Sequence, residues 1–167
     1  MAVCHNIPIG GCRLLQAADY RGRNASKRAY FYGYKVALLI HSEGLPVELA
    51  FIPGSDAEQS ALAPLDFDLP TGSVVWQDRG LTDEEWEDFY LENEGIEFAT
   101  QRKKNLLTGD DFPTYIAKKQ NRKRVETSIS EITRRFAKRI HALTSEGFQV
   151  KGFLFILAFA SIKYFQI

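Results

Sequence analysis

The chain has few of the features that mark secreted or membrane proteins. Its 167 residues include only two cysteines, Cys4 and Cys12, which are too few for a disulfide framework. We find no charged-then-apolar leader with a cleavage site, and we therefore expect a reducing cytoplasm. The apolar run at residues 152–162 has 11 residues, whereas a membrane span needs about 20. We expect this run to form a buried helix or strand, with no membrane as partner.

Net charge is also absent, because 21 Lys and Arg balance 21 Asp and Glu. The balance hides a strong segregation along the chain. Residues 43–97 contain 15 acids and one base, residues 101–139 contain 12 bases and four acids, and residues 1–42 contain six bases and one acid. Two basic regions flanking an acidic middle favour nucleic acid as the partner over a small molecule. The alternative is that these charges coat solvated helix faces, and we prefer it for residues 83–94.

Length and composition indicate one folded domain. A chain of this length with 45% hydrophobic and 13% aromatic residues can bury a single core. We therefore expect residues 1–167 to form a single domain.

Two apolar segments separated by turn residues indicate an antiparallel hairpin. Residues 29–41 are rich in aromatic and β-branched side chains, and residues 46–52 are apolar again. Residues 42–44 between them supply turn chemistry. Ser55 and Glu58 have the spacing of a capping box and predict a short helix after the hairpin.

The middle of the chain predicts two short strands separated by a helix. Residues 73–77 are apolar and predict a central, covered strand, and residues 96–100 predict another. Thr82 and Glu85 form a second capping box, and Gly95 is a typical residue after a helix end. Together with the hairpin, these elements indicate an α/β fold.

The clearest predicted helix runs from about residue 122 to residue 143, after Pro113, where helical structure can already begin. At about 100° per residue, Glu126 falls at the edge of its apolar stripe, and Arg122 lies one turn earlier on the same flank. The apolar residues step by three and four, and they are Val125, Ile129, Ile132, Phe136, Ile140 and Leu143.

Asp78 and Glu126 are the two candidate metal ligands. Asp78 directly follows the predicted strand 73–77, and a glutamate at the edge of the long helix can reach toward that strand end. Carboxylates can hold Mg²⁺ while neighbouring Lys and Arg hold a phosphodiester backbone. The alternative is an Asp78 that caps the following helix and an Arg122–Glu126 surface pair.

Five local motifs occur in an order that is typical of one family: YRGRNASK at residues 20–27, YGYK at 32–35, PGS at 53–55, DRG at 78–80 and RKRVE at 122–126. With these motifs the chain resembles, over nearly its whole length, the RNase H-like catalytic domain of the DDE transposases of bacterial insertion sequences. The resemblance implies an RNase H-like mixed sheet with an antiparallel hairpin and parallel strands, flanked by helices.

The resemblance also implies roles for single residues. Asp78 would be the second acidic metal ligand, Glu126 the third, and Arg122 a helper beside them. Two Mg²⁺ or Mn²⁺ ions would serve the cleavage of phosphodiester bonds at transposon ends and the joining of those ends to target DNA. The partner would be double-stranded DNA in the bacterial cytoplasm, with a homodimer as one possible assembly. Residues implied in DNA contact are Arg102, Lys103, Lys104, Arg122, Lys123 and Arg124.

The beginning of the sequence departs from the family pattern. The first catalytic aspartate of the family belongs a few residues before the stretch that resembles Val3 to Asn6, and the first acid here is Asp19. We expect Asp19 to lie in a loop after the first strand and not to replace that ligand. We therefore expect a partial domain, truncated at its N-terminus, whose first strand is missing or incomplete and which is inactive as it stands.

Three classes of function remain open from the sequence. The first is a DDE transposase catalytic domain. The second is a non-catalytic DNA-binding or inhibitory remnant of a transposase, which the missing aspartate favours. The third is an unrelated α/β interaction module, in which Asp78 and Glu126 would lie far apart.

Overall fold

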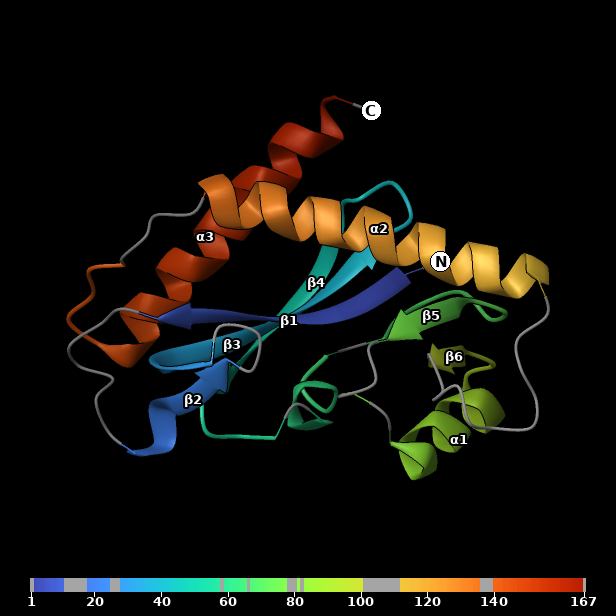
Figure 1. Ribbon diagram of the computed structural model, residues 1–167, viewed down its shortest axis with the longest axis horizontal. Helices are drawn as coiled ribbons and strands as arrows, with labels where there is room; N and C mark the ends of the chain where they lie inside the picture. Colours follow the sequence, from blue (N-terminus) through green and yellow to red (C-terminus); the bar gives the residue numbers. More distant parts are fainter. Residues whose placement is uncertain are drawn as a thin grey trace.

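The computed structural model describes residues 2–10, 18–24, 28–57, 59–65, 67–77, 81, 83–100, 112–135 and 140–166. These residues form a mixed β-sheet with α-helices on both faces (Figure 1). The strands are β1 (Ala2–Gly10), β2 (Arg21–Asn24), β3 (Ala29–His41), β4 (Pro46–Pro53), β5 (Val74–Gln77) and β6 (Glu97–Thr100). The helices are η2 (Ala18–Tyr20), η3 (Gln59–Ala61), α1 (Glu84–Asn93), α2 (Phe112–Arg135) and α3 (Ser145–Tyr164), of which η2 and η3 are 3₁₀ helices.

The strand order of the sheet is β2-β3-β1-β5-β6, and β4 also pairs with β3. The predicted hairpin is confirmed as the antiparallel pair of β3 and β4, and β5 runs parallel to both β1 and β6. The sequence led us to expect a first strand that is missing or incomplete. Residues 2–10 nevertheless form the nine-residue strand β1, which pairs with β3 along its whole length.

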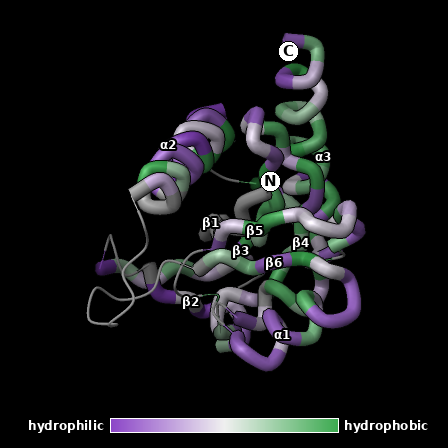
Figure 2. The backbone as a smooth tube through the Cα atoms, turned by 90° about the vertical axis from the view of Figure 1, so that its right-hand side faces the viewer, coloured by the Kyte–Doolittle hydropathy of each residue, from purple (hydrophilic) through white to green (hydrophobic). Residues whose placement is uncertain are grey.

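The central strand β3 is buried on both faces. Val36, Leu38 and Ile40 pack against α2 and α3, whereas Ala37 and Leu39 belong to the core on the α1 side. Figure 2 shows the same layers, with α2 and α3 on one side of the strands and α1 on the other. A strand that reads as a continuous apolar run is typical of a sheet covered on both faces.

The helix α3 covers one end of the sheet with only part of its surface. Its residues Phe148, Gly152, Ile156 and Phe159 are buried. A Cβ atom at Gly152 would lie 2.9 Å from the ring of Phe51 on β4, so glycine permits this close approach. The predicted buried helix is therefore present, but several of its apolar residues are exposed: Val150, Phe153, Leu154, Phe155, Leu157 and Ile162. By length and composition alone, α3 could also span a membrane.

The extent of the long helix differs from the prediction. α2 runs from Phe112 to Arg135, and residues 140–143, which were predicted to be helical, are not part of a helix. Ile140 is buried in a separate cluster with Tyr34 and Phe148, while Leu143 is 92% exposed. Ile140 continues the helical spacing of apolar residues in the sequence, but it is buried in a different part of the core from the residues of α2. Phe136 lies outside the described residues.

Two predicted helix starts also differ. Asp83 caps α1, because its carboxylate accepts a hydrogen bond from the Trp86 backbone N–H at 3.3 Å; the predicted cap, Thr82, lies outside the described residues. After the hairpin, the described residues form the 3₁₀ turn η3 where an α-helix was predicted. Ser55 does not cap it, since its hydroxyl donates to the Asp19 carbonyl at 2.5 Å. Glu58 lies outside the described residues.

Candidate functional site

Glu126 lies in the middle of α2 and is open to solvent. Its neighbour Val125 is buried in the core against β3, so Glu126 stands at the edge of the packed face, as the helical periodicity predicted. The Arg122 guanidinium donates from Nε to Glu126 Oε1 at 2.9 Å, and both side chains are 60% exposed. This pair holds the carboxylate in a defined position without removing it from water.

Asp78 lies outside the described residues, so its separation from Glu126 stays a prediction. The strand before it is where the sequence placed it: β5 ends at Gln77, which pairs with Cys4 of β1 and Thr100 of β6. The Gln77 side chain is buried, and its Nε2 donates to a carboxylate oxygen of Glu87 on α1. This contact fixes the orientation of the last residue of β5.

Among the described residues, no group of three or more His, Cys, Asp or Glu is arranged to hold a metal ion. Asp19 lies in η2, beyond the end of β1, where its carbonyl accepts hydrogen bonds from both the backbone and the hydroxyl of Ser55. That position supports the expectation that Asp19 does not act as a ligand beside β5. Glu126 is therefore the described residue on which the candidate metal site depends.

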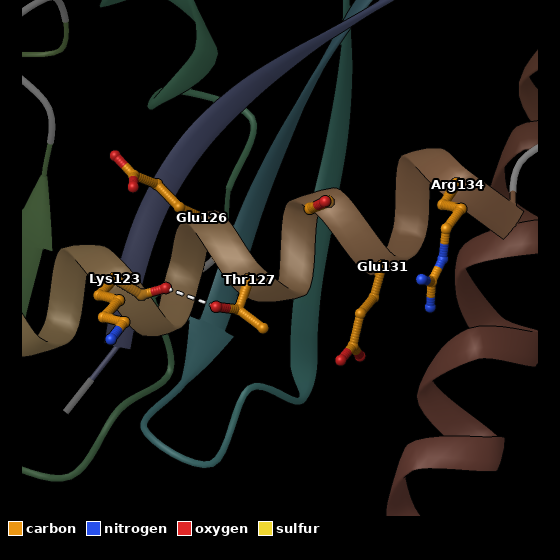
Figure 3. A pocket seen from close by; sticks show the side chains of 6 residues that line it. Lys123, Glu126, Thr127, Glu131 and Arg134 are labelled. Atoms are coloured by element: carbon orange, nitrogen blue, oxygen red, sulfur yellow. Dashed lines mark hydrogen bonds between the residues drawn. The ribbon is translucent and has the colours of Figure 1, made fainter.

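An open depression on α2 lies next to Glu126. Figure 3 shows that Glu126 projects from the opposite edge of the helix to Lys123 and Glu131, so these charges do not converge on one point. Thr127 Oγ1 donates to the Lys123 carbonyl at 2.8 Å and is thus engaged within the helix. We regard the depression as helix surface. Its lining residues are Lys123, Glu126, Thr127, Ser130, Glu131 and Arg134.

The predicted DNA-binding residues fall into two groups. Arg102, Lys103 and Lys104 lie outside the described residues, so their placement stays untested. Lys123 and Arg124 are exposed on α2. Arg124 Nη1 donates to the carbonyl of Ser42 in the β3–β4 turn at 3.2 Å, so this side chain also ties the helix to the hairpin.

One cluster of exposed residues was missed from the sequence. Arg21 and Arg23 of β2 lie opposite Tyr32 and Tyr30 of β3, and all four side chains are exposed. The signal was present as alternation, since residues two apart on a strand share a face. Only the pairing of β2 with β3 shows that the residues of both strands share one surface.

Residues 1–142 match the family model described as Transposase DDE domain. The chain belongs to the DDE transposase family. DNA transposition is therefore its function at the level of the family, DNA is the family's substrate, and divalent metal ions are its usual cofactor. The observed mixed sheet, with an antiparallel hairpin, a parallel pair and flanking helices, agrees with such a domain. Membership excludes the third alternative, an unrelated α/β module.

The match does not include α3, because it ends at residue 142 and α3 begins at Ser145. A search of curated proteins and a search of solved structures each gave no significant match.

Proposed function

We propose that this DDE transposase domain holds divalent metal ions between Asp78, at the end of β5, and Glu126, on α2. The observation that carries the proposal is the solvent-exposed Glu126 carboxylate, which lies at the edge of the α2 core face and is positioned by Arg122. Carboxylate oxygens are the ligands that Mg²⁺ and Mn²⁺ prefer in proteins.

The alternation of β5 supports the placement of Asp78. Val75 is part of the α1-side core, and Gln77 reaches Glu87 of α1, so both side chains face α1. Successive side chains on a strand point to opposite faces. If the strand direction continues for one more residue, Asp78 faces the side of the sheet that α2 covers.

The strand order supports an RNase H-like arrangement. β5 runs parallel to β1 and ends beside it, while β3 and β4 extend the sheet on the other side of β1 in antiparallel order. Ligands of open α/β sheets bind outside the carboxyl ends of parallel strands, which here is the end of β5. Asp78 follows that end directly.

The residues of this chain would have separate tasks in the reaction. Asp78 and Glu126 would hold a pair of Mg²⁺ ions, which when bound would supply activation of the attacking oxygen and stabilisation of the leaving oxygen in an in-line displacement at phosphorus. Arg122 keeps the Glu126 carboxylate oriented. An exposed ion pair contributes at most about 1 kcal/mol to stability, so the carboxylate can also bind a metal ion at little energetic cost.

The basic residues would hold the DNA backbone. Residues 101–139 carry 12 Lys and Arg against four acids, and Lys123 and Arg124 lie one turn or less from Glu126 on α2. Arg102, Lys103 and Lys104 precede α2 in the sequence and are proposed to contact transposon-end DNA. Such contacts position a duplex without reading its sequence.

We further propose that the sequence as given binds DNA without cleaving it, which is the second class of function above. The supporting observation is that β1, the strand beside β5, contains no Asp or Glu in residues 2–10. Two of the three acidic ligands should hold Mg²⁺ weakly, because this ion keeps most of its waters and needs a few well-placed carboxylates.

The test compares metal binding with strand cleavage. Mn²⁺ binding in the presence of a DNA duplex, followed by electron paramagnetic resonance, should weaken in Asp78→Asn and in Glu126→Gln. Glu131→Gln on the same helix is the matched control and should bind Mn²⁺ like the unmodified chain. Unchanged Mn²⁺ binding in Glu126→Gln would contradict the proposed metal site. Mg²⁺-dependent nicking of DNA that Asp78→Ala abolishes would contradict the proposed lack of cleavage.

A further inference from the structure

The hairpin formed by β2 and β3 presents one face made of arginine and tyrosine. Arg21 lies opposite Tyr32, and Arg23 lies opposite Tyr30, in the antiparallel register of the two strands. Tyr30 is 61% exposed and Tyr32 is 39% exposed. Opposed residues of an antiparallel pair share a face, so these four side chains form a single surface, which we name the Arg–Tyr face.

Packing on the other side of the hairpin fixes which face is outward. A Cβ atom at Gly22 would lie 2.3 Å from the ring of Phe31 and 2.7 Å from the carbonyl of Gly54. The absence of a side chain at Gly22 therefore leaves room for the Phe31 ring. Because the Phe31 ring lies on the face of the hairpin at Gly22, Tyr30 and Tyr32 on either side of it point to the other face, where both are exposed.

The base of the hairpin is anchored to the rest of the domain. Tyr34, two residues after Tyr32, is buried, stacks on Phe148 of α3 and shares a 2.5 Å hydrogen bond with Ser145. Gln149 Nε2 also donates to the Tyr34 hydroxyl at 3.0 Å. These contacts anchor β3 to α3 two residues after Tyr32.

The chemistry of this face fits unpaired nucleotides. The Arg21 guanidinium lies 4.3 Å from the centroid of the Tyr30 ring, and a cation over one side of an aromatic ring leaves the other side free to stack. Proteins that bind single strands combine exposed aromatic rings, on which bases stack, with cations that contact phosphates. No Asp or Glu occurs between Tyr20 and Ser42 to oppose this charge.

The pairing of the strands gives the distance between the Arg–Tyr face and the end of β5. Gln77 of β5 is level with Cys4 of β1, which pairs with Leu39 of β3. Tyr30 lies nine residues from Leu39 along β3, a distance of about 30 Å at about 3.3 Å per residue. Tyr30 and Tyr32 also point to the same side of β3 as Val36 and Leu38, which α2 and α3 cover.

We propose that the Arg–Tyr face binds single-stranded DNA, with bases stacked on Tyr30 and Tyr32 and phosphates held by Arg21 and Arg23. The proposal goes beyond the metal site and does not depend on it. A strand held there would lie about 30 Å from the end of β5, on the side of the sheet that carries α2.

The test uses fluorescence anisotropy with a labelled oligothymidylate of about 20 nucleotides and a duplex of equal length. Tyr30→Leu and Tyr32→Leu should each weaken binding of the single strand by about 5- to 150-fold, the range for loss of one stacked base. Tyr30→Phe should retain binding, because it keeps the ring. Tyr164→Leu, which removes a 66% exposed tyrosine from α3, is the matched control and should have no effect.

Salt dependence examines the arginines separately. Replacing Arg21 and Arg23 by alanine should reduce the slope of log K against log salt by about 0.7 for each phosphate of the single strand that an arginine had neutralised. Unchanged affinity in Tyr30→Leu would overturn the proposal. An equal weakening for the duplex and the single strand would overturn it as well, since it would indicate backbone contact without stacking.

A second measurement needs no variant and therefore no assumption about folding. An oligonucleotide that carries 5-iododeoxyuridine should crosslink, under ultraviolet light, to the peptide that contains Tyr30 and Tyr32, and mass spectrometry would locate the bond. Crosslinks confined to other peptides would count against the face. All of these binding measurements are made without divalent metal ions, so failure of the metal site and failure of this proposal can be told apart.

Discussion

Arg122 donates a 2.9 Å hydrogen bond to Glu126 one helical turn later, and both side chains remain 60% exposed. A pair of this kind stabilises a helix by a few tenths of a kcal/mol. Its position matters more than its energy, because it orients a carboxylate beside a buried residue, Val125, and leaves that carboxylate accessible.

The first prediction separates stability from function at this pair. Arg122→Ala and Glu126→Gln should each change the free energy of unfolding by less than about 0.5 kcal/mol, as measured by urea denaturation. Metal binding should nevertheless fall in Glu126→Gln. A stability loss above about 2 kcal/mol in either variant would show that the pair is structural and would remove the main support for a metal ligand at this position.

The second prediction concerns the turn between β3 and β4, where Gly44 has a φ of +85° and a Cβ atom would lie 2.7 Å from Ser128 Oγ of α2. Gly72 has the same φ with no atom near its Cβ position. Gly72→Ala should therefore cost about 1 kcal/mol from the backbone alone. Gly44→Ala should cost more, because Ser128 must move and weaken its 3.1 Å hydrogen bond to the Gly44 carbonyl.

Urea denaturation of the two glycine variants, each against the unmodified chain, measures that difference. An equal decrease in stability would mean that α2 does not depend on the contact between Gly44 and Ser128.

The third prediction concerns alkaline pH. The hydrogen bond to Tyr34 raises the pKa of Tyr20 above its ordinary value, against an opposing hydrogen bond with Ser145. Below the unfolded pKa, about 10, Tyr20 is protonated in both states, so its contribution to stability is fully present. As pH rises further, the unfolded chain loses this proton first and the contribution declines.

Tyr20→Phe is the variant that measures this effect. The unmodified chain should be more stable than Tyr20→Phe near neutral pH, and the difference should shrink above about pH 10, as followed by chemical denaturation at a series of pH values. A difference that stays constant through that range would show that Tyr20 does not titrate with folding.

The fourth prediction concerns binding to duplex DNA through the basic segment. If Arg102, Lys103 and Lys104 each contact a phosphate, their joint replacement by glutamine should flatten the slope of log K against log salt by up to about 3, at about 0.9 per contact. Lys151 and Lys163 of α3 are suitable control positions, because Lys151 bonds the His141 carbonyl and Lys163 pairs with Glu131. An unchanged slope in the triple variant would identify the basic segment as solvated surface.

Local sequence patterns were sufficient to predict most of the sheet. The hairpin of β3 and β4 follows from β-branched residues on both sides of a turn, and β5 and β6 follow from short apolar segments. The end of α2 could not be predicted in the same way. Ile140 continues the helical spacing, but its burial against Tyr34 and Phe148 arises from tertiary packing that periodicity does not contain.

The sequence likewise predicted one part of the functional surface and not another. The exposed edge position of Glu126 followed from helical geometry, because it depends only on Val125 and Ile129 pointing inward. The Arg–Tyr face could not be recognised so easily, since it depends on the pairing register of β2 with β3 and on Phe31 occupying the opposite side. Side-chain alternation indicated the face, but only the pairing showed that the two strands contribute to it together.

The boundary of the family match has a practical consequence for producing this protein. The match ends at residue 142, yet Phe148, Ile156 and Phe159 of α3 are buried against the sheet and its neighbours. A gene shortened to that boundary would uncover Val36, Leu38 and other apolar side chains of β3 along one side. Such a product should collect in inclusion bodies and be degraded quickly by proteases, whereas a gene that extends through α3 keeps these side chains covered.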